Sequence, residues 1–211
     1  MVPLIPGLIT AYLIGSIPTA LLAGYFIGGV DIRTTGSKNA GATNLYRSFG
    51  LKPYILVLCF DIFKGFAVVG ILAPYVEPGS ISILQAEILC GIAAVFGHIF
   101  TIFARFRGGK GVATAAGMLL ALIPSQLLAA FGLYLLVISI SHYVSLGSIS
   151  AAISIPVIFS VEYYLYGHTY PNEIYIVSGL LSILIVVTHR SNIGRLIGGV
   201  ENKTFFFGKG S

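Results

Sequence analysis

Charged residues are scarce in this chain. Only 9% of its 211 residues are Asp, Glu, Lys or Arg, whereas 56% are hydrophobic. Because a soluble globular domain carries about 25% charged residues, a soluble fold of this length would leave much apolar surface in water. The composition therefore excludes an ordinary soluble domain and indicates that a lipid bilayer surrounds most of the chain.

Residues 1–30 contain no charged side chain at all. A membrane-spanning helix needs about 20 apolar residues, so we expect one here, with Pro18 as a tolerated kink. The basic segment that opens a secretory signal peptide is missing, which argues against that alternative.

Potential metal ligands are also few. The four histidines are dispersed, and the two cysteines, Cys59 and Cys90, both lie in apolar runs where free cysteines usually serve as packing residues. No Cys or His spacing is typical of a metal site. We therefore expect neither a metal ion nor a cofactor.

The basic residues gather in three segments. Of the twelve, only Lys64 lies elsewhere, inside an apolar run. The first segment holds Arg33, Lys38, Arg47 and Lys52, the second Arg105, Arg107 and Lys110, and the third Arg190, Arg195, Lys203 and Lys209. By the positive-inside rule all three segments face the cytoplasm. The net charge of +5 is thereby explained by topology, and no nucleic-acid partner is expected.

This one-sided distribution determines whether the number of membrane spans between the basic segments is odd or even. One crossing precedes the first segment, which places the N-terminus outside and the C-terminus in the cytoplasm. Two spans lie between the first and second segments, with a turn near residues 77–79. The long apolar stretch 112–189 needs an even number of spans, and four short ones fit better than two, with breaks at Pro124, 139–148 and 167–171.

The predicted fold is therefore all-α, a polytopic membrane helical bundle of about seven transmembrane helices. Its fourth span, 112–123, is only about 18 Å long at 1.5 Å per residue. We expect this span to be short or broken, and its length leaves both a complete and an incomplete crossing open.

The first basic segment combines glycines with polar side chains. Either Ser37 or Asn39 is a candidate cap for a helix that starts near Ala40. Asn39, Thr43 and Arg47 are spaced by four residues and would share one helical face, where free backbone N–H groups attract anions. The alternative is an ordinary interfacial helix whose arginine extends its charge toward water.

The second segment places Lys110 among glycines, just before a helix. Gly108, Gly109 and Gly111 suit a cradle in which backbone N–H groups and the ammonium meet a phosphate. This is not a nucleotide-binding P-loop, because Gly111 stands where Ser or Thr should follow the lysine. A loop that only sets topology would explain the nearby arginines, but it explains the glycines poorly.

The third segment contains His189 and Asn192, which are three residues apart and therefore neighbours on a helix. Together with Arg195 and Glu201 they form a polar group that favours a functional role, although a lone terminal histidine is more often structural.

For the other polar residues, both a structural role and a functional role remain open. Asp61 and Lys64 are three apart in an apolar run, where they would form an intramembrane pair that is either structural or supports a site. His98 enters the second basic segment, and Ser148 lies near a turn expected on the cytoplasmic side.

Taken in order, these motifs resemble the bacterial acyl-phosphate:glycerol-3-phosphate acyltransferases. The resemblance rests on Gly-Ser-Lys-Asn-Ala-Gly-Ala-Thr-Asn at 36–44, Gly-Gly-Lys-Gly-Val-Ala-Thr at 108–114 and His-Arg-Ser-Asn-Ile-Gly-Arg-Leu at 189–196. It covers essentially the whole chain. It implies seven membrane helices, an external N-terminus, and one integral-membrane acyltransferase domain over 1–211.

The resemblance also implies a reaction. A fatty acyl group would move from acyl phosphate to the sn-1 hydroxyl of glycerol 3-phosphate, giving lysophosphatidic acid and phosphate in the first acylation step of phospholipid synthesis. Neither acyl-CoA nor acyl carrier protein would be the direct donor. The expected location is the bacterial inner membrane, as a monomer among membrane lipids, with the active site on the cytoplasmic face.

Residue roles follow at the matching positions. The expected catalytic residues are Ser37, Arg47, Lys110, His189 and Asn192, and the expected substrate-binding residues are Asn39, Thr43, Asn44, Gly108, Gly109 and Ser148. The residues of the first segment would hold the acyl phosphate or the departing phosphate, and the others would hold glycerol 3-phosphate. One departure is Lys38, where the family usually has glycine; the change could alter the loop turn or the activity.

Two other classes compete with this prediction. Broken helices and basic motifs also suit a transporter or flippase for an anionic solute or lipid. Because a carrier usually places its site near the membrane midplane, clustering of the charges on one face disfavours it. A scaffold that binds anionic lipids is third. Turnover of acyl phosphate with glycerol 3-phosphate separates the enzyme from both.

Overall fold

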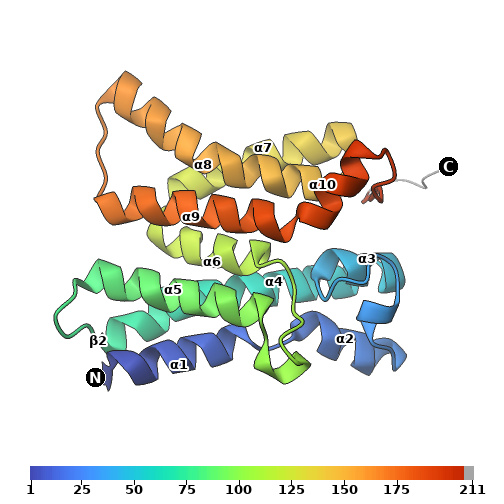
Figure 1. Cartoon of the computed structure of the whole chain (residues 1–211), viewed down its shortest axis with the longest axis horizontal. Helices are drawn as coiled ribbons and strands as arrows, with labels where there is room; N and C mark the ends of the chain where they lie inside the picture. Colours follow the sequence, from blue (N-terminus) through green and yellow to red (C-terminus); the bar gives the residue numbers. More distant parts are fainter. Residues whose placement is uncertain (207–211) are drawn as a thin grey trace. The chain divides into compact units, whose positions relative to one another are not determined.

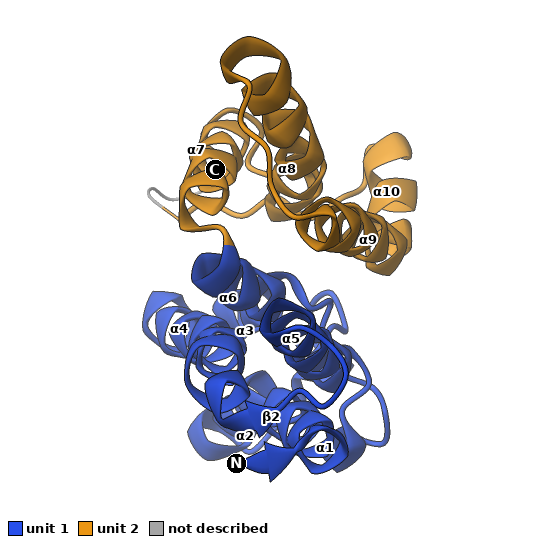
Figure 2. Ribbon diagram, turned by 90° about the vertical axis from the view of Figure 1, so that its left-hand side faces the viewer, with its two compact units in different colours: residues 1–122 blue, residues 123–211 orange. Residues whose placement is uncertain are grey.

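The computed structural model describes residues 1–206, so Lys209 of the third basic segment lies outside the described residues. The chain divides into two compact units, Met1–Leu122 and Ile123–Ser211 (Figure 2). Each unit is described by itself, and the single integral-membrane domain over 1–211 stays a prediction.

The first span is interrupted at the predicted kink. Helix α1 (Leu4–Gly15) and helix α2 (Thr19–Gly28) are separated by three residues that end in Pro18. The backbone of this break is satisfied from neighbouring helices: Lys64 Nζ donates to the Ile17 carbonyl at 3.2 Å, and the Thr101 hydroxyl donates to the Ser16 carbonyl. Non-helical backbone at membrane depth requires such protein partners.

The rest of the first unit alternates helices with short connections. In chain order these are β1 (Val2–Pro3), η1 (Ile32–Thr34), α3 (Ala42–Phe49), α4 (Leu51–Ala67), the π-helical η2 (Val68–Leu72), η3 (Ala73–Tyr75), β2 (Val76–Glu77), α5 (Ile83–Ile99), η4 (Ile102–Ala104) and α6 (Val112–Leu122). The strands pair in parallel, with Val2 opposite Val76. Apart from this short pairing the unit is helical, as predicted.

Glycines let the helices of the first unit approach closely. Helix α1 packs on α5, and α4 packs on α6. A Cβ at Gly15 would overlap the Ala94 carbonyl of α5, and one at Gly117 would overlap the Ile62 carbonyl of α4. Small residues at such crossings are typical of helix association in membranes, where van der Waals packing replaces the hydrophobic effect.

The second unit consists of α7 (Pro124–Ser141), α8 (Val144–Tyr166), α9 (Asn172–Thr188) and α10 (Arg190–Ile197). Helix α8 packs against both α7 and α9. The breaks fall where the sequence predicts them, at Pro124, at His142 and between residues 167 and 171. Helices α9 and α10 bend by 59° at their junction.

Within residues 1–206, five helical segments are long and apolar enough to cross a membrane, or six if α9 and α10 form one bent span. The predicted span 112–123 is α6, whose 11 residues reach only about 16 Å, half of the hydrocarbon core of about 30 Å. Helix α6 is thus short, as expected. The count of seven crossings and the outward N-terminus stay predictions.

The connections gather the motifs at the ends of the helices. In the first unit, the segments that join α2 to α4 and α5 to α6 lie at one end, while the β1–β2 pairing lies at the other (Figure 1). In the second unit, the α7–α8 turn and α10 share one end, where the Thr204 N–H donates to the His142 carbonyl at 2.8 Å.

Candidate functional site

The first motif is a loop that leads into α3. This helix begins at Ala42, and Gly41, which has no side chain to accept a hydrogen bond from the first helix N–H groups, occupies its N-cap position. The expectation that Ser37 or Asn39 caps a helix near Ala40 is therefore wrong. Asn39 lies before the helix, so only Thr43 and Arg47 of the predicted polar face are on α3.

Asn44 organises this loop from inside. Its side chain is buried, and its amide donates to the carbonyls of Ile32 at 2.7 Å and Thr35 at 3.1 Å. The Ser37 N–H donates to Asn44 Oδ1 at 2.8 Å. These contacts make Asn44 a residue that positions Ser37, a role that its predicted place in substrate binding did not anticipate.

Arg33 joins the first loop to the second. Its Nη2 lies 2.6 Å from Asp31 Oδ2, and its Nη1 donates to the Ala104 carbonyl at 3.1 Å. The hydrogen bonds and charge of Arg33 lower the pKa of Asp31 despite partial burial, and Asp31 in turn raises the pKa of Arg33. The hydrogen bond from Arg33 to Ala104 connects the first basic segment to the start of the second, and Asp31 holds the guanidinium in place. Sequence spacing gave no signal for a contact between residues 71 positions apart.

The second motif folds back on the end of α5. The Gly108 N–H donates to the Ile99 carbonyl at 3.0 Å, and the Gly109 N–H donates to the His98 carbonyl at 3.1 Å. Both N–H groups therefore hydrogen-bond to the end of the helix and do not supply the expected cradle. The predicted contacts of Gly108 and Gly109 with substrate stay a prediction. Lys110, the cation predicted to meet a phosphate in this loop, is half-buried.

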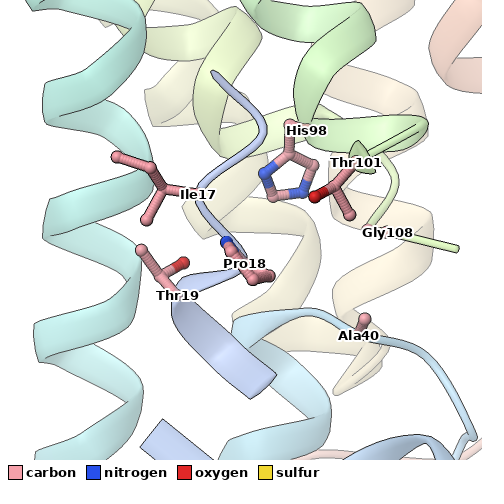
Figure 3. Close-up of a pocket in the computed structure, with 8 residues that line it drawn as sticks. Ile17, Pro18, Thr19, Ala40, His98, Thr101 and Gly108 are labelled. Atoms are coloured by element: carbon pink, nitrogen blue, oxygen red, sulfur yellow. The ribbon is translucent and has the colours of Figure 1, made fainter. Parts of the chain in front are cut away.

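A small pocket lies where the two loops meet the break in the first span. Its lining residues are Ile17, Pro18, Thr19, Ala40, His98, Thr101, Gly108 and Gly109. Figure 3 shows the His98 ring between Pro18 and Thr101, with Ala40 of the first loop on the far side of the pocket. The pocket thus brings the first and second motifs together within one unit.

Thr19 and His98 of this pocket also belong to a buried polar cluster around Asp61. Asp61 Oδ1 is 2.7 Å from Lys64 Nζ, accepts a hydrogen bond from the Thr19 hydroxyl at 2.7 Å, and lies 3.5 Å from His98 Nδ1. The predicted intramembrane pair is confirmed, and His98 and Thr19 join it. Because burying an unpaired charge is costly, the pairing is what allows these groups to sit at this depth.

The second unit has its own polar cluster around Glu201. Glu201 Oε1 accepts from Ser145 Oγ at 3.0 Å and from Asn192 Nδ2 at 2.7 Å, and Arg195 Nε donates to Oε2 at 2.6 Å. Burial alone would raise the pKa of Glu201, but these hydrogen bonds outweigh it and lower the pKa. The sequence analysis grouped Asn192, Arg195 and Glu201. It did not include Ser145, which lies on another helix.

His189 lies at the bend between α9 and α10, where it is the N-cap residue of α10, and Asn192 lies within α10. The prediction that both residues lie inside one continuous helix is therefore wrong. The His189 side chain is only 3% exposed, and its Nδ1 is 2.7 Å from the Ile185 carbonyl. Since a carbonyl can only accept, Nδ1 carries the proton, and the neutral imidazole has its lone pair on Nε2.

Ser148 lies one turn beyond Ser145 on α8, at the same end of the second unit. Its hydroxyl donates to the Val144 carbonyl at 2.9 Å, which fixes its direction while its oxygen keeps acceptor capacity. The structure thus brings Ser148, His189 and Asn192 to one end of the second unit. Their predicted contacts with substrate stay predictions.

Comparison with known proteins agrees with these motifs. Residues 5–199 match the family model for glycerol-3-phosphate acyltransferase. The glycerol-3-phosphate acyltransferases of Chlorobaculum tepidum and Chlorobium chlorochromatii are each 41% identical, with 94% and 98% of this chain and 95% and 99% of theirs covered.

Solved structures agree as well. Crystal structures of PlsY, an integral membrane glycerol 3-phosphate acyltransferase, are similar to this chain in both the glycerol 3-phosphate form and the lysophosphatidic acid form. The TM-score is 0.82 for both, the identity is 36% and 35%, and 96% of each chain is covered. This chain is therefore a helical integral membrane protein that belongs to the glycerol-3-phosphate acyltransferase family.

Proposed function

We propose that this protein transfers a fatty acyl group from acyl phosphate to the sn-1 hydroxyl of glycerol 3-phosphate, and that lysophosphatidic acid and inorganic phosphate are the products. The observation that carries the proposal is the match over 96% of the chain to a glycerol 3-phosphate acyltransferase solved with its acceptor. The motifs that resemble acyl-phosphate-dependent enzymes support the choice of donor.

The chemistry needs no covalent intermediate on the protein. The acceptor hydroxyl oxygen attacks the acyl carbon, a new ester C–O bond forms, and the C–O bond to phosphate breaks. The departing phosphate can take up the proton that the hydroxyl loses, so atoms and charges balance. Because acyl phosphate is a mixed anhydride with a good leaving group, positioning and charge stabilisation suffice.

The roles of the side chains follow from their chemistry. Ser37, Thr43 and Arg47 on the first loop and α3 would bind the phosphate of the donor. Lys110 would contact the phosphate of glycerol 3-phosphate with its compact ammonium group, while His189 and Asn192 would orient this acceptor. No metal ion or cofactor takes part, and apolar helices beside the site accept the acyl chain from the bilayer.

The proposal includes a location. We infer a monomeric multi-pass protein of the bacterial inner membrane. The basic segments cluster at helix ends, and the positive-inside rule assigns such segments to the cytoplasm, so we place the active site on the cytoplasmic face. A cytoplasmic site would meet soluble glycerol 3-phosphate directly.

The decisive experiment is turnover by the purified protein. Palmitoyl phosphate and labelled glycerol 3-phosphate should give labelled lysophosphatidic acid, and positional analysis should find the acyl group at sn-1. Acyl-CoA or acyl carrier protein as the only donor should give none, and a chelator should not inhibit. Equal turnover with acyl-CoA in the absence of acyl phosphate would overturn the donor assignment, and acylation at sn-2 would overturn the position.

A further inference from the structure

We propose that His98 is a positioning residue whose imidazole sets the path of the Gly108–Lys110 segment, and that it acts on the reaction through Lys110. The inference rests on the proposed function in one respect, namely that Lys110 meets a substrate phosphate. Its geometric part concerns only His98 and its neighbours and stands on the structure alone.

His98 holds Gly109 in two ways. Its backbone carbonyl accepts the Gly109 N–H at 3.1 Å. Its ring lies against the same residue: a Cβ at position 109 would overlap His98 Nε2 and would lie 3.1 Å from both Cδ2 and Cε1. The backbone at residue 109 therefore follows the surface of the imidazole closely.

The imidazole is itself anchored from the opposite side. His98 Nδ1 lies 3.5 Å from Asp61 Oδ1, and this carboxylate is held by Lys64 Nζ and the Thr19 hydroxyl, each at 2.7 Å. Asp61 and Lys64 are almost fully buried. A ring that contacts a fixed carboxylate through one nitrogen and the loop through the other cannot turn without losing one contact.

The two glycines that precede Lys110 therefore meet different constraints. At Gly108 a Cβ would overlap backbone, the carbonyl of His98. At Gly109 the three nearest atoms all belong to the His98 side chain, and the backbone lies outside the left-handed region that requires glycine. The imidazole is thus the reason that residue 109 is glycine.

Lys110 is fixed between two packed neighbours. On one side Gly109 lies on the imidazole. On the other, Gly111 adopts a φ of +84° and packs against Ile99, whose Cδ1 would be 3.0 Å from a Cβ there. A shift of the loop at His98 would move the Lys110 backbone directly, and a displacement of about 1 Å in a catalytic group can cost about a hundredfold in rate.

The test is a double-mutant cycle between His98→Asn and Gly109→Ala. Asparagine places its amide near the position of Nδ1, so Asp61 keeps a partner, while the space of Nε2 is vacated. Gly109→Ala alone should lower both the thermal midpoint and turnover, the latter by about tenfold, or 1.4 kcal/mol. In the His98→Asn background the same substitution should leave the thermal midpoint nearly unchanged and change turnover less than about twofold, because the overlapping atoms are gone.

Gly108→Ala is the matched control. It adds the same methyl group one residue earlier, against backbone that no side-chain change removes, so it should be equally harmful with either residue at position 98. Gly109→Ala that is as harmful beside asparagine as beside histidine would overturn the steric relationship.

Steady-state kinetics test whether His98 positions Lys110. His98→Asn alone should raise the acceptor KM and lower kcat/KM about tenfold, while His168→Asn in the α8–α9 connection should leave both near wild type. Wild-type kinetics for His98→Asn would overturn the positioning role. A wild-type protein without turnover would instead overturn the proposed function and with it the role through Lys110, and the thermal cycle would still decide the relationship between His98 and Gly109.

Discussion

Asn192 donates a hydrogen bond from Nδ2 to Glu201 Oε1, at 2.7 Å. The same oxygen accepts from Ser145 at the start of α8, and the second oxygen accepts from Arg195 on α10. One buried carboxylate thereby ties two helices and the following tail together in the second unit, and it fixes the direction of an amide that we propose contacts the acceptor.

Replacement of Glu201 by glutamine should therefore destabilise the protein. The amide keeps the size of the side chain but cannot accept from Asn192, Ser145 and Arg195 together, so at least one of the three donors loses its partner. We expect a loss of about 1–3 kcal/mol in the free energy of unfolding. Thermal unfolding of purified protein measures it, with the exposed Glu77→Gln as control. Equal midpoints for the two variants would contradict the central role of Glu201.

The same carboxylate should give the stability a pH dependence. Because the pKa of Glu201 is lower in the folded protein than its ordinary value of 4.5, the ionised form is the one that stabilises the fold. Its contribution is present above that ordinary value and is lost as the pH falls through the lower folded value. Thermal midpoints measured from neutral to acidic pH should fall more steeply for wild type than for Glu201→Gln; parallel curves would rule this out.

Lys38 should carry backbone strain. Its φ is +58°, in the left-handed region, where a side chain with a Cβ costs roughly 1–2 kcal/mol. This conformation favours glycine, which is the residue that the resemblance implies at this position. Lys38→Gly should raise the stability by about 1 kcal/mol. Lys38→Ala, which removes the charge but keeps the Cβ, should not; if both variants gain equally in thermal unfolding, the charge and not the backbone is responsible.

Much of this architecture was predictable because the bilayer imposes strong patterns. Apolar runs, Pro124 and the clustered basic residues located most helix ends correctly, and the short α6 was expected from its length alone. The spacing of Asp61 and Lys64 by three residues predicted their ion pair. These features depend on residues close in sequence, which periodicity and composition can reveal.

The rest depends on contacts between residues far apart in sequence. Nothing local to Arg33 indicates that it reaches the Ala104 carbonyl, and Ser145 gave no sign of its bond to Glu201. The glycines of the second motif suggested an anion cradle, yet Gly108 and Gly109 donate to the end of α5. Glycine permits a close approach, but the sequence does not say what approaches.

His189 either orients the acceptor or acts as a general base, and its variants distinguish these two roles. We expect His189→Gln to keep much of the rate and mainly raise the acceptor KM, because the substrate phosphate can accept the proton and the Nδ1 partner is a carbonyl, not a carboxylate. A general base would instead make His189→Ala slower by about 10²- to 10⁴-fold. Steady-state kinetics of both variants decide; an unchanged KM with a thousandfold lower kcat in the glutamine variant would contradict orientation.

Cysteine labelling tests the topology. In a background without Cys59 and Cys90, single cysteines at Lys38, Arg107 and Lys203 should be shielded from an impermeant thiol reagent added outside sealed cells. A cysteine at Thr169, in the α8–α9 connection, should react. The reason is that basic segments stay on the cytoplasmic side. Reaction at position 38 or 107 before the cells are opened would reverse the proposed orientation.

Lys110 gives the sharpest test of the proposed mechanism. It lies between Gly109 and Gly111, one residue before α6 begins at Val112, where the partial positive charge of the helix start adds to its own. If Lys110 only set topology, Lys110→Arg would be silent. In contact with a phosphate between closely packed glycines, the larger planar guanidinium should fit poorly.

We therefore expect Lys110→Ala to be essentially inactive and Lys110→Arg to be impaired at least tenfold, about 1.4 kcal/mol of transition-state stabilisation. Both variants should insert and purify normally, because the fold around residue 110 is fixed by backbone hydrogen bonds of its neighbours. Arg105→Lys, which keeps a charge in the same segment, should retain near-normal turnover. Full activity of correctly folded Lys110→Ala would remove the central cation from the site, and a mechanism based on charge stabilisation by this residue could not stand.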